Sequence, residues 1–159
     1  MKKSIAIVFA TTHGTTEMVA YELITRIGED RAMAINLKNV KKVDLSQFNN
    51  VIIGGSIHAG KLNSRVTTFC NENLVDLLQK KVSLFICGMN NSQMDAQLTN
   101  AFPALLFSHA TKKLSVGGEF RFNRMNFFEK LIVRKIAGIK ESQSQINHNA
   151  IIELVNTTN

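Results

Sequence analysis

Apolar runs alternate with amphipathic stretches along the chain, and together they predict buried strands separated by helices. Five segments read as strands, namely residues 4–9, 32–37, 51–53, 82–87 and 112–116. The nearly continuous apolar character of the first and fourth is typical of parallel strands that are buried on both faces. Apolar positions recur at helical spacing in residues 18–27, 66–78, 93–109 (interrupted by Pro103), 127–136 and 150–155. This alternation predicts an α/β fold.

The expected architecture is a doubly wound, five-stranded parallel sheet with helices on both faces, formed by residues 1–159 as one domain. A hydrophobic content of 45% with one Pro and nine Gly argues against a disordered or fibrous chain. No apolar run approaches the roughly 18 residues of a membrane span, so a cytoplasmic location is expected. The two cysteines and four histidines have no ligand-like spacing, and no metal is expected.

The loop after the first strand carries four hydroxyl groups around a glycine. Thr11, Thr12, Thr15 and Thr16 flank Gly14 directly before a predicted helix, and residues 4–25 contain no Lys or Arg. Amides at a helix N-terminus lack intrahelical partners and lie at the positive end of the helix dipole. The loop can therefore hold a phosphate without a cationic side chain, although a Thr-rich helix cap is the simpler alternative.

Most glycines of the chain follow predicted strands. Open α/β sheets bind ligands beyond the carboxyl ends of their strands, and glycine lets the backbone approach a ligand closely. The positions concerned are Gly14, Gly54, Gly55, Gly60, Gly88, Gly117 and Gly118. This clustering predicts a ligand site at that edge of the sheet.

Residues 9–17, Phe-Ala-Thr-Thr-His-Gly-Thr-Thr-Glu, resemble the phosphate loop of the flavodoxin family. The resemblance implies FMN as cofactor, with its phosphate at the first loop and its isoalloxazine ring between the loops after the third and fourth strands. The implied cofactor-binding residues are Thr11, Thr12, His13, Gly14, Thr15 and Thr16, then Ser56, Ile57, His58, Ala59 and Gly60, and finally Gly88, Met89, Asn90 and Asn91.

Residues 51–61 and 126–136 also resemble a narrower branch, the flavodoxin-domain proteins typified by menaquinone-dependent protoporphyrinogen oxidase. That resemblance implies an FMN-dependent oxidoreductase of heme biosynthesis, which passes electrons from protoporphyrinogen IX to a quinone. No catalytic acid or base is assigned. The alternative is a flavodoxin-type electron-transfer protein that docks to redox partners and has no substrate of its own.

The net charge of +7 is concentrated in one segment. Residues 111–140 contain eight basic and two acidic residues, and the rest of the chain is nearly neutral. Phe127 projects among Lys130 and Arg134 on a predicted helix, an arrangement that suits an anionic membrane surface. It equally suits an anionic porphyrin-type substrate or an acidic redox partner, while a solvated helix face is the plainest alternative. No recognised nucleic-acid module accompanies the charge, so nucleic acid is not an expected partner.

Overall fold

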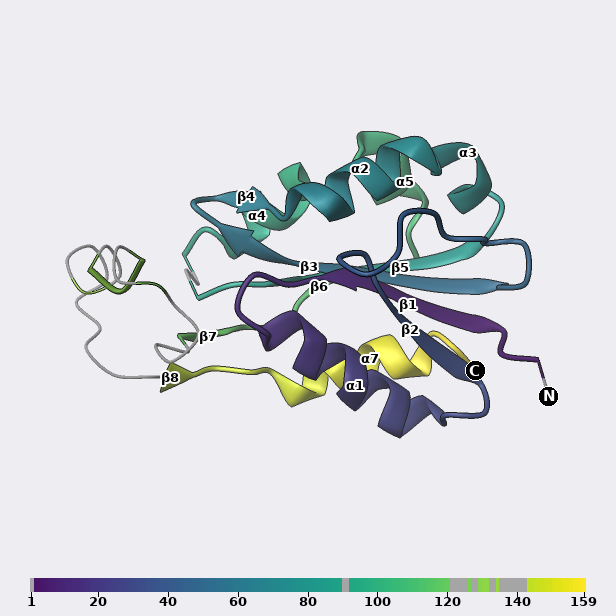
Figure 1. The fold of residues 1–159 in the computed structure, drawn as a ribbon, viewed down its shortest axis with the longest axis horizontal. Helices are drawn as coiled ribbons and strands as arrows, with labels where there is room; N and C mark the ends of the chain where they lie inside the picture. Colours follow the sequence, from purple (N-terminus) through teal and green to yellow (C-terminus); the bar gives the residue numbers. More distant parts are fainter. Residues whose placement is uncertain (1, 90–91, 121–125, 127–128, 132–133, 135–142) are drawn as a thin grey trace.

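The computed structural model describes residues 2–89, 92–120, 126, 129–131, 134 and 143–159. Figure 1 shows a central sheet with helices on both faces. The sheet contains β1 (Ile5–Ala10), β2 (Ala32–Asn36), β3 (Asn50–His58), β4 (Lys61–Leu62), β5 (Lys81–Cys87) and β6 (Lys112–Ser115). Five of these strands run parallel in the order β2-β1-β3-β5-β6, and β4 pairs antiparallel with β3. The predicted doubly wound parallel sheet is confirmed, with one short strand added.

Helices pack on both sides of the sheet. α1 (Thr15–Ile27) and α7 (His148–Asn156) cover one face (Figure 1). The other face carries α2 (Ser64–Glu72), α3 (Leu74–Leu77), α4 (Met94–Ala101) and α5 (Ala104–His109). No helix among the described residues is long and apolar enough to cross a membrane.

The strand β1 shows why the chain needs two helical layers. All six of its residues are buried, and successive side chains point to opposite faces. Ile7 and Phe9 join a core with Leu23 of α1, whereas Val8 and Ala10 join a separate core with Val66 of α2. The continuous apolar run therefore supplies both cores at once, as the sequence pattern predicts for a central parallel strand.

Local signals explain where several helices begin and end. Gly28, at φ 114°, closes α1, and its N–H donates to the Ile24 carbonyl. The Asn63 side chain caps α2 by accepting the Arg65 N–H. Pro103 separates α4 from α5, as predicted from sequence. The helix expected over residues 66–78 is instead divided at Asn73, whose side chain donates to the Phe69 carbonyl and ends α2.

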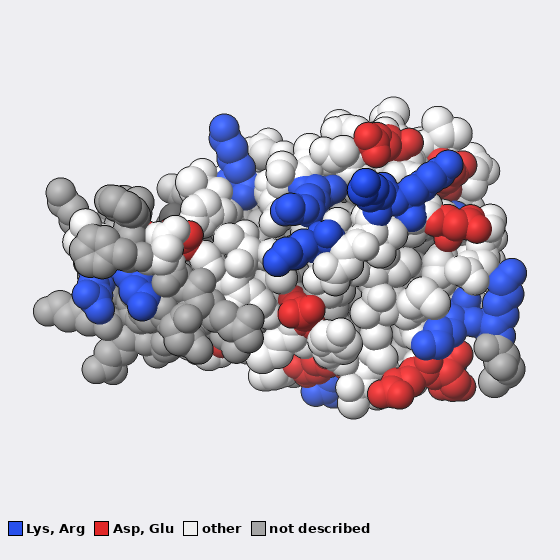
Figure 2. Space-filling view, in the orientation of Figure 1, with Lys and Arg blue, Asp and Glu red and all other residues white. Residues whose placement is uncertain are grey.

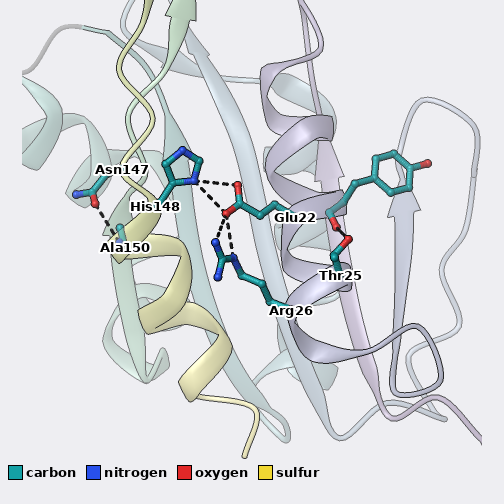
Figure 3. A network of polar contacts seen from close by, with 7 residues as sticks. Glu22, Thr25, Arg26, Asn147, His148 and Ala150 are labelled. Atoms are coloured by element: carbon teal, nitrogen blue, oxygen red, sulfur yellow. Dashed lines mark hydrogen bonds and ion pairs between the residues drawn. The ribbon is translucent and has the colours of Figure 1, made fainter.

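A polar network joins the two helices on the α1 face (Figure 3). Glu22 of α1 accepts from Arg26 one turn further along, at 2.9 Å. The same carboxylate lies 3.0 Å from Nδ1 of His148, the first residue of α7. The Asn147 side chain caps α7 by accepting the Ala150 N–H. Glu22 thus links the middle of α1 to the start of α7.

The chain leaves the sheet after β6 in a way that the sequence pattern did not predict. Glu119–Phe120 (β7) pairs antiparallel with Gln143–Ser144 (β8) in a two-stranded ribbon. This ribbon lies at the carboxyl end of the sheet (Figure 1). Of the predicted helix over 127–136, residues 129–131 and 134 are helical, while Phe127 lies outside the described residues.

Candidate functional site

The carboxyl ends of β1, β3 and β5 meet at one edge of the sheet, where the sequence predicts a ligand. The strands are in register, with Ala10 beside Gly55 and Ser56 beside Cys87. The first loop, residues 10–16, therefore lies near the end of β3, and the end of β3 lies near the end of β5. This edge brings together the described members of all three predicted groups of site residues.

The first loop folds back on itself at the start of α1. Gly14 is the N-cap at φ 92°, a left-handed conformation that favours glycine, and its N–H donates to the Thr11 hydroxyl at 2.9 Å. No side chain caps the helix. Because Gly14 has no side chain, the amides of Thr15, Thr16 and Glu17 remain available to an anion.

Thr16 contributes a buried polar group beside this helix start. Its side chain is fully buried, and its hydroxyl has no oxygen or nitrogen partner among the described residues. It lies beside the Cys87 thiol at the end of β5. Burial raises the pKa of Cys87 to about 12, although the Thr16 contact opposes this, and burial alone raises that of Cys70 to about 12. Both cysteines are neutral thiols at neutral pH, so neither is a reactive thiolate.

Side chains connect the first loop to the end of β3. The hydroxyls of Thr12 and Ser56 lie 3.1 Å apart. The rings of His13 and His58 have centroids 6.2 Å apart in an edge-to-face arrangement. These contacts place two predicted ligand-binding segments against each other.

The structure corrects the prediction that residues 56–60 form a loop. Ser56, Ile57 and His58 continue β3, and β4 folds back to pair with it. Ala59 at φ 49° and Gly60 at φ 74° form the turn, consistent with the type I′ geometry that joins two antiparallel strands. The two residues of β4 are too few to show an alternating pattern in the sequence. Ala rarely adopts a positive φ, so Ala59 does not indicate a turn either. The predicted residues remain at the edge, but they lie in a hydrogen-bonded hairpin.

Two of the glycines assigned to the ligand edge serve the packing of the sheet instead. Gly54 and Gly55 lie within β3. A Cβ on Gly54 would lie 2.0 Å from the Phe85 ring, and one on Gly55 would lie 2.9 Å from a Val66 methyl. Close packing of neighbouring side chains, rather than approach of a ligand, requires glycine at both positions.

The end of β5 packs against the chain that leaves β6. The Gly88 N–H donates to the Gly117 carbonyl at 2.9 Å, and a Cβ on Gly118 would lie 2.8 Å from the Gly88 carbonyl carbon. A Cβ on Gly88 would lie 3.1 Å from Cε of Met94 and 3.5 Å from Cβ of Ile57. Met89 follows as a half-buried residue, and Asn90 and Asn91 lie outside the described residues.

Glu129 is a residue at this site that the sequence did not indicate. Its Oε2 lies 2.6 Å from Nε2 of His13, and both side chains are mostly buried. Asn126 positions the carboxylate by donating to it at 2.9 Å and accepting the Glu129 N–H at 2.8 Å. The segment after β7 therefore reaches the first loop. The long separation in sequence left no periodic signal for this contact.

The described part of the chain contains no cluster of side chains that could bind a metal ion. No group of three or more His, Cys, Asp or Glu residues has the arrangement of a metal site there. The site at the sheet edge is built from hydroxyls, amides and imidazoles, with the Glu129 carboxylate against His13 and apolar side chains from Ile57 and Met89. Its chemistry suits an anionic, partly apolar organic ligand.

Comparison with known protein families identifies this architecture. Residues 6–147, which include the first loop and the ends of β3 and β5, match the model of the flavodoxin domain. The chain belongs to the flavodoxin family. No sequence in a curated set of proteins matches this flavodoxin-family chain.

Solved structures with TM-scores above 0.5 show the same fold at low sequence identity. The flavodiiron protein of Giardia intestinalis aligns with a TM-score of 0.56 and 14% identity, over 99% of this chain and 36% of that one. An archaeal flavodoxin aligns with a TM-score of 0.51 and 19% identity, over 72% of this chain and 81% of that one. A Fusobacterium nucleatum flavodoxin bound to flavin mononucleotide aligns with a TM-score of 0.47 and 22% identity, over 70% of this chain and 69% of that one.

Proposed function

We propose that this protein is an FMN-binding redox protein whose cofactor lies at the carboxyl edge of the sheet. The uncapped start of α1 is the observation that carries the proposal. Gly14 leaves the first-turn amides open, and the buried Thr16 hydroxyl has no oxygen or nitrogen partner among the described residues. Membership of the flavodoxin family supports FMN as the ligand whose phosphate meets these groups.

Two groups of described residues would contact this cofactor, one at its phosphate and one at its flavin ring. The amides of residues 15–17 and the Thr16 hydroxyl would hold the phosphate by hydrogen bonds and the helix dipole. Ile57, His58 and Met89 would line the flavin, since they come from the ends of β3 and β5. FMN, when bound, supplies hydride and single-electron transfer, and the protein supplies its placement and electrostatics.

We propose two specific activities for this FMN-binding redox protein. Protoporphyrinogen IX dehydrogenation with a quinone acceptor draws on the resemblance at residues 51–61 and 126–136. The comparisons match the flavodoxin domain as a whole and give that branch no separate support. Electron transfer between protein partners is equally compatible with the family. A cation-lined hollow described in the next subsection favours it, because it suits an acidic partner.

The proposed phosphate site can be tested by titrating apoprotein with FMN and with riboflavin, which lacks the phosphate. Two or more charge-assisted hydrogen bonds predict roughly 100-fold tighter binding of FMN. Thr16→Val removes the buried hydroxyl at nearly constant volume and should weaken FMN binding about tenfold without affecting riboflavin. Thr25→Val, later on the same helix, is the matched control. Equal affinities for both flavins would refute the phosphate site.

The two activities separate in an assay with holoprotein, protoporphyrinogen IX and a menaquinone analogue. Porphyrin fluorescence that rises faster than the autoxidation control supports the dehydrogenase. A rate equal to autoxidation, in protein that binds FMN and can be reduced, rejects the dehydrogenase and leaves electron transfer as the function.

A further inference from the structure

A hollow of about 730 Å³ opens between the β2–β3 connection and α2. Val43 and Phe69, both buried, contribute apolar surface to its lining. Four cationic side chains surround it, from Lys38, Lys41, Lys42 and Arg65. Figure 2 shows Lys and Arg side chains gathered on this face, over the β2–β3 connection and α2. We call these four cations and the surface between them the basic hollow.

The cations of the basic hollow lack ion-pair partners in the described part of the chain. All four residues are exposed, and none makes an ion pair within 4.0 Å with a described acidic residue. Glu72 is the one acidic residue that lines the hollow. Hydrogen bonds from Ser46 lower the pKa of Asp44, directly after Val43, and the charge of nearby Lys42 lowers it further. Four cations thus face two nearby carboxylates, and the hollow keeps an excess of positive charge. A concave surface with focused positive charge attracts an anionic partner.

The basic hollow adjoins the proposed flavin site. Leu37, at its rim, donates its N–H to the carbonyl of Phe9, directly before the first loop. Arg65 lies at the start of α2, where the Asn63 N–H donates to the Ser56 carbonyl. Both walls of the hollow are thus hydrogen-bonded to the strand ends that form the site. A partner bound in the hollow would lie beside the first loop.

The form of the hollow favours one class of partner. Its cations are exposed and spread along a rim, whereas a small phosphate is held by donors that converge on it. Phe69 is only 5% exposed, so no aromatic ring of the lining is free to stack with a nucleobase. A concave surface also does not fit a flat bilayer. Acidic side chains at the rim, with an apolar residue against Val40, satisfy both parts of the lining, because Val40 is 37% exposed.

We propose that the basic hollow docks an acidic segment of a protein partner that also carries apolar residues. The docking itself is independent of the cofactor. That the partner exchanges electrons with the flavin rests on the proposed function, because the hollow borders that site.

The test uses the full chain and a short fluorescein-labelled peptide of Glu and Asp with two Leu residues. Fluorescence anisotropy gives the affinity, and ¹⁵N-edited NMR spectra locate the binding surface. The triple variant Lys38→Gln, Lys41→Gln, Arg65→Gln should weaken binding about tenfold. The control variant Lys81→Gln, Lys112→Gln, Lys113→Gln loses the same charge from β5 and β6, on the opposite side of the sheet from β2. Its binding should change less than twofold.

The proposal expects shifted resonances in residues 37–43 and 64–73, with binding weakened by salt and lost when Gln and Asn replace the acidic residues of the peptide. No binding, equal weakening by both triple variants, or shifts confined to residues 126–134 would overturn it. Inorganic phosphate or phosphatidylserine vesicles that compete at the hollow more strongly than the peptide would also overturn it. FMN titration of the same samples tests the proposed function separately, because docking of the peptide does not depend on bound FMN.

Discussion

Packing around Gly54 leaves no room for a side chain at that position. It lies opposite Phe85 in the β3–β5 pairing, and the Phe85 ring occupies the space of a Cβ at 2.0 Å. Phe85 is completely buried, so the ring cannot move into solvent. Gly54→Ala should therefore lower the free energy of unfolding by about 3 kcal/mol.

Urea unfolding at equilibrium measures this effect. Gly60→Ala is the control, because nothing lies within 4 Å of its added Cβ and only its positive φ disfavours Ala. It should cost about 1 kcal/mol. A loss at Gly54→Ala no greater than at Gly60→Ala would contradict the packing account.

Glu129 places a carboxylate against the first loop, where the proposed FMN phosphate also binds. Its contact with His13 at 2.6 Å brings negative charge close to a dianion. Glu129→Gln should therefore tighten FMN binding about fivefold at low salt, and less at high salt. Fluorescence quenching of FMN measures the affinity, with Glu29→Gln at an exposed position beyond α1 as control. Weaker binding by Glu129→Gln would mean that the carboxylate supports the site.

Elements with a strong apolar pattern were predictable, and contacts between distant segments were not. The five parallel strands and the first loop follow from buried apolar runs and from glycine at the helix start. The β3–β4 hairpin was missed because its turn uses Ala59 at a positive φ. The pairing of His13 with Glu129 and the basic hollow depend on tertiary packing, which one sequence does not display. The helix expected over 66–78 failed at Asn73 because a side-chain bond to the backbone ended it.

The link between α1 and α7 makes stability depend on pH through Glu22. Burial tends to raise the pKa of Glu22, but hydrogen bonds and charges from His148 and Arg26 outweigh it and hold the pKa below its usual 4.5. Folding therefore favours the ionised carboxylate. Its stabilisation is present above pH 4.5 and is lost as the pH falls through the lower pKa of the folded state.

Glu22→Gln should lower the free energy of unfolding by about 0.5 kcal/mol at neutral pH, since solvent screens the pair. The difference from wild type should shrink as the pH falls from 4.5 through the lower pKa of the folded state. Urea midpoints across this range measure it, with Glu29→Gln as the control. A difference that persists unchanged in acid would show that packing of the side chain, rather than its charge, supports the helix pair.

Across the whole molecule, positive charge and the cofactor site are neighbouring but separate features. The first strand and first loop contain no Lys or Arg, whereas twelve of the nineteen Lys and Arg residues lie around the basic hollow or in residues 111–140. FMN affinity should thus change less than about threefold between low and high salt. Titrations in NaCl measure this, and a steep loss of affinity with salt would show that cations hold the phosphate.

The cofactor content of the purified protein tests the central claim most directly. Protein purified without added flavin, then denatured, should release FMN in a ratio approaching one per chain, identified by absorbance and chromatography. Apoprotein should regain the same ratio on titration with FMN. A colourless protein that also fails to bind added FMN would contradict the account.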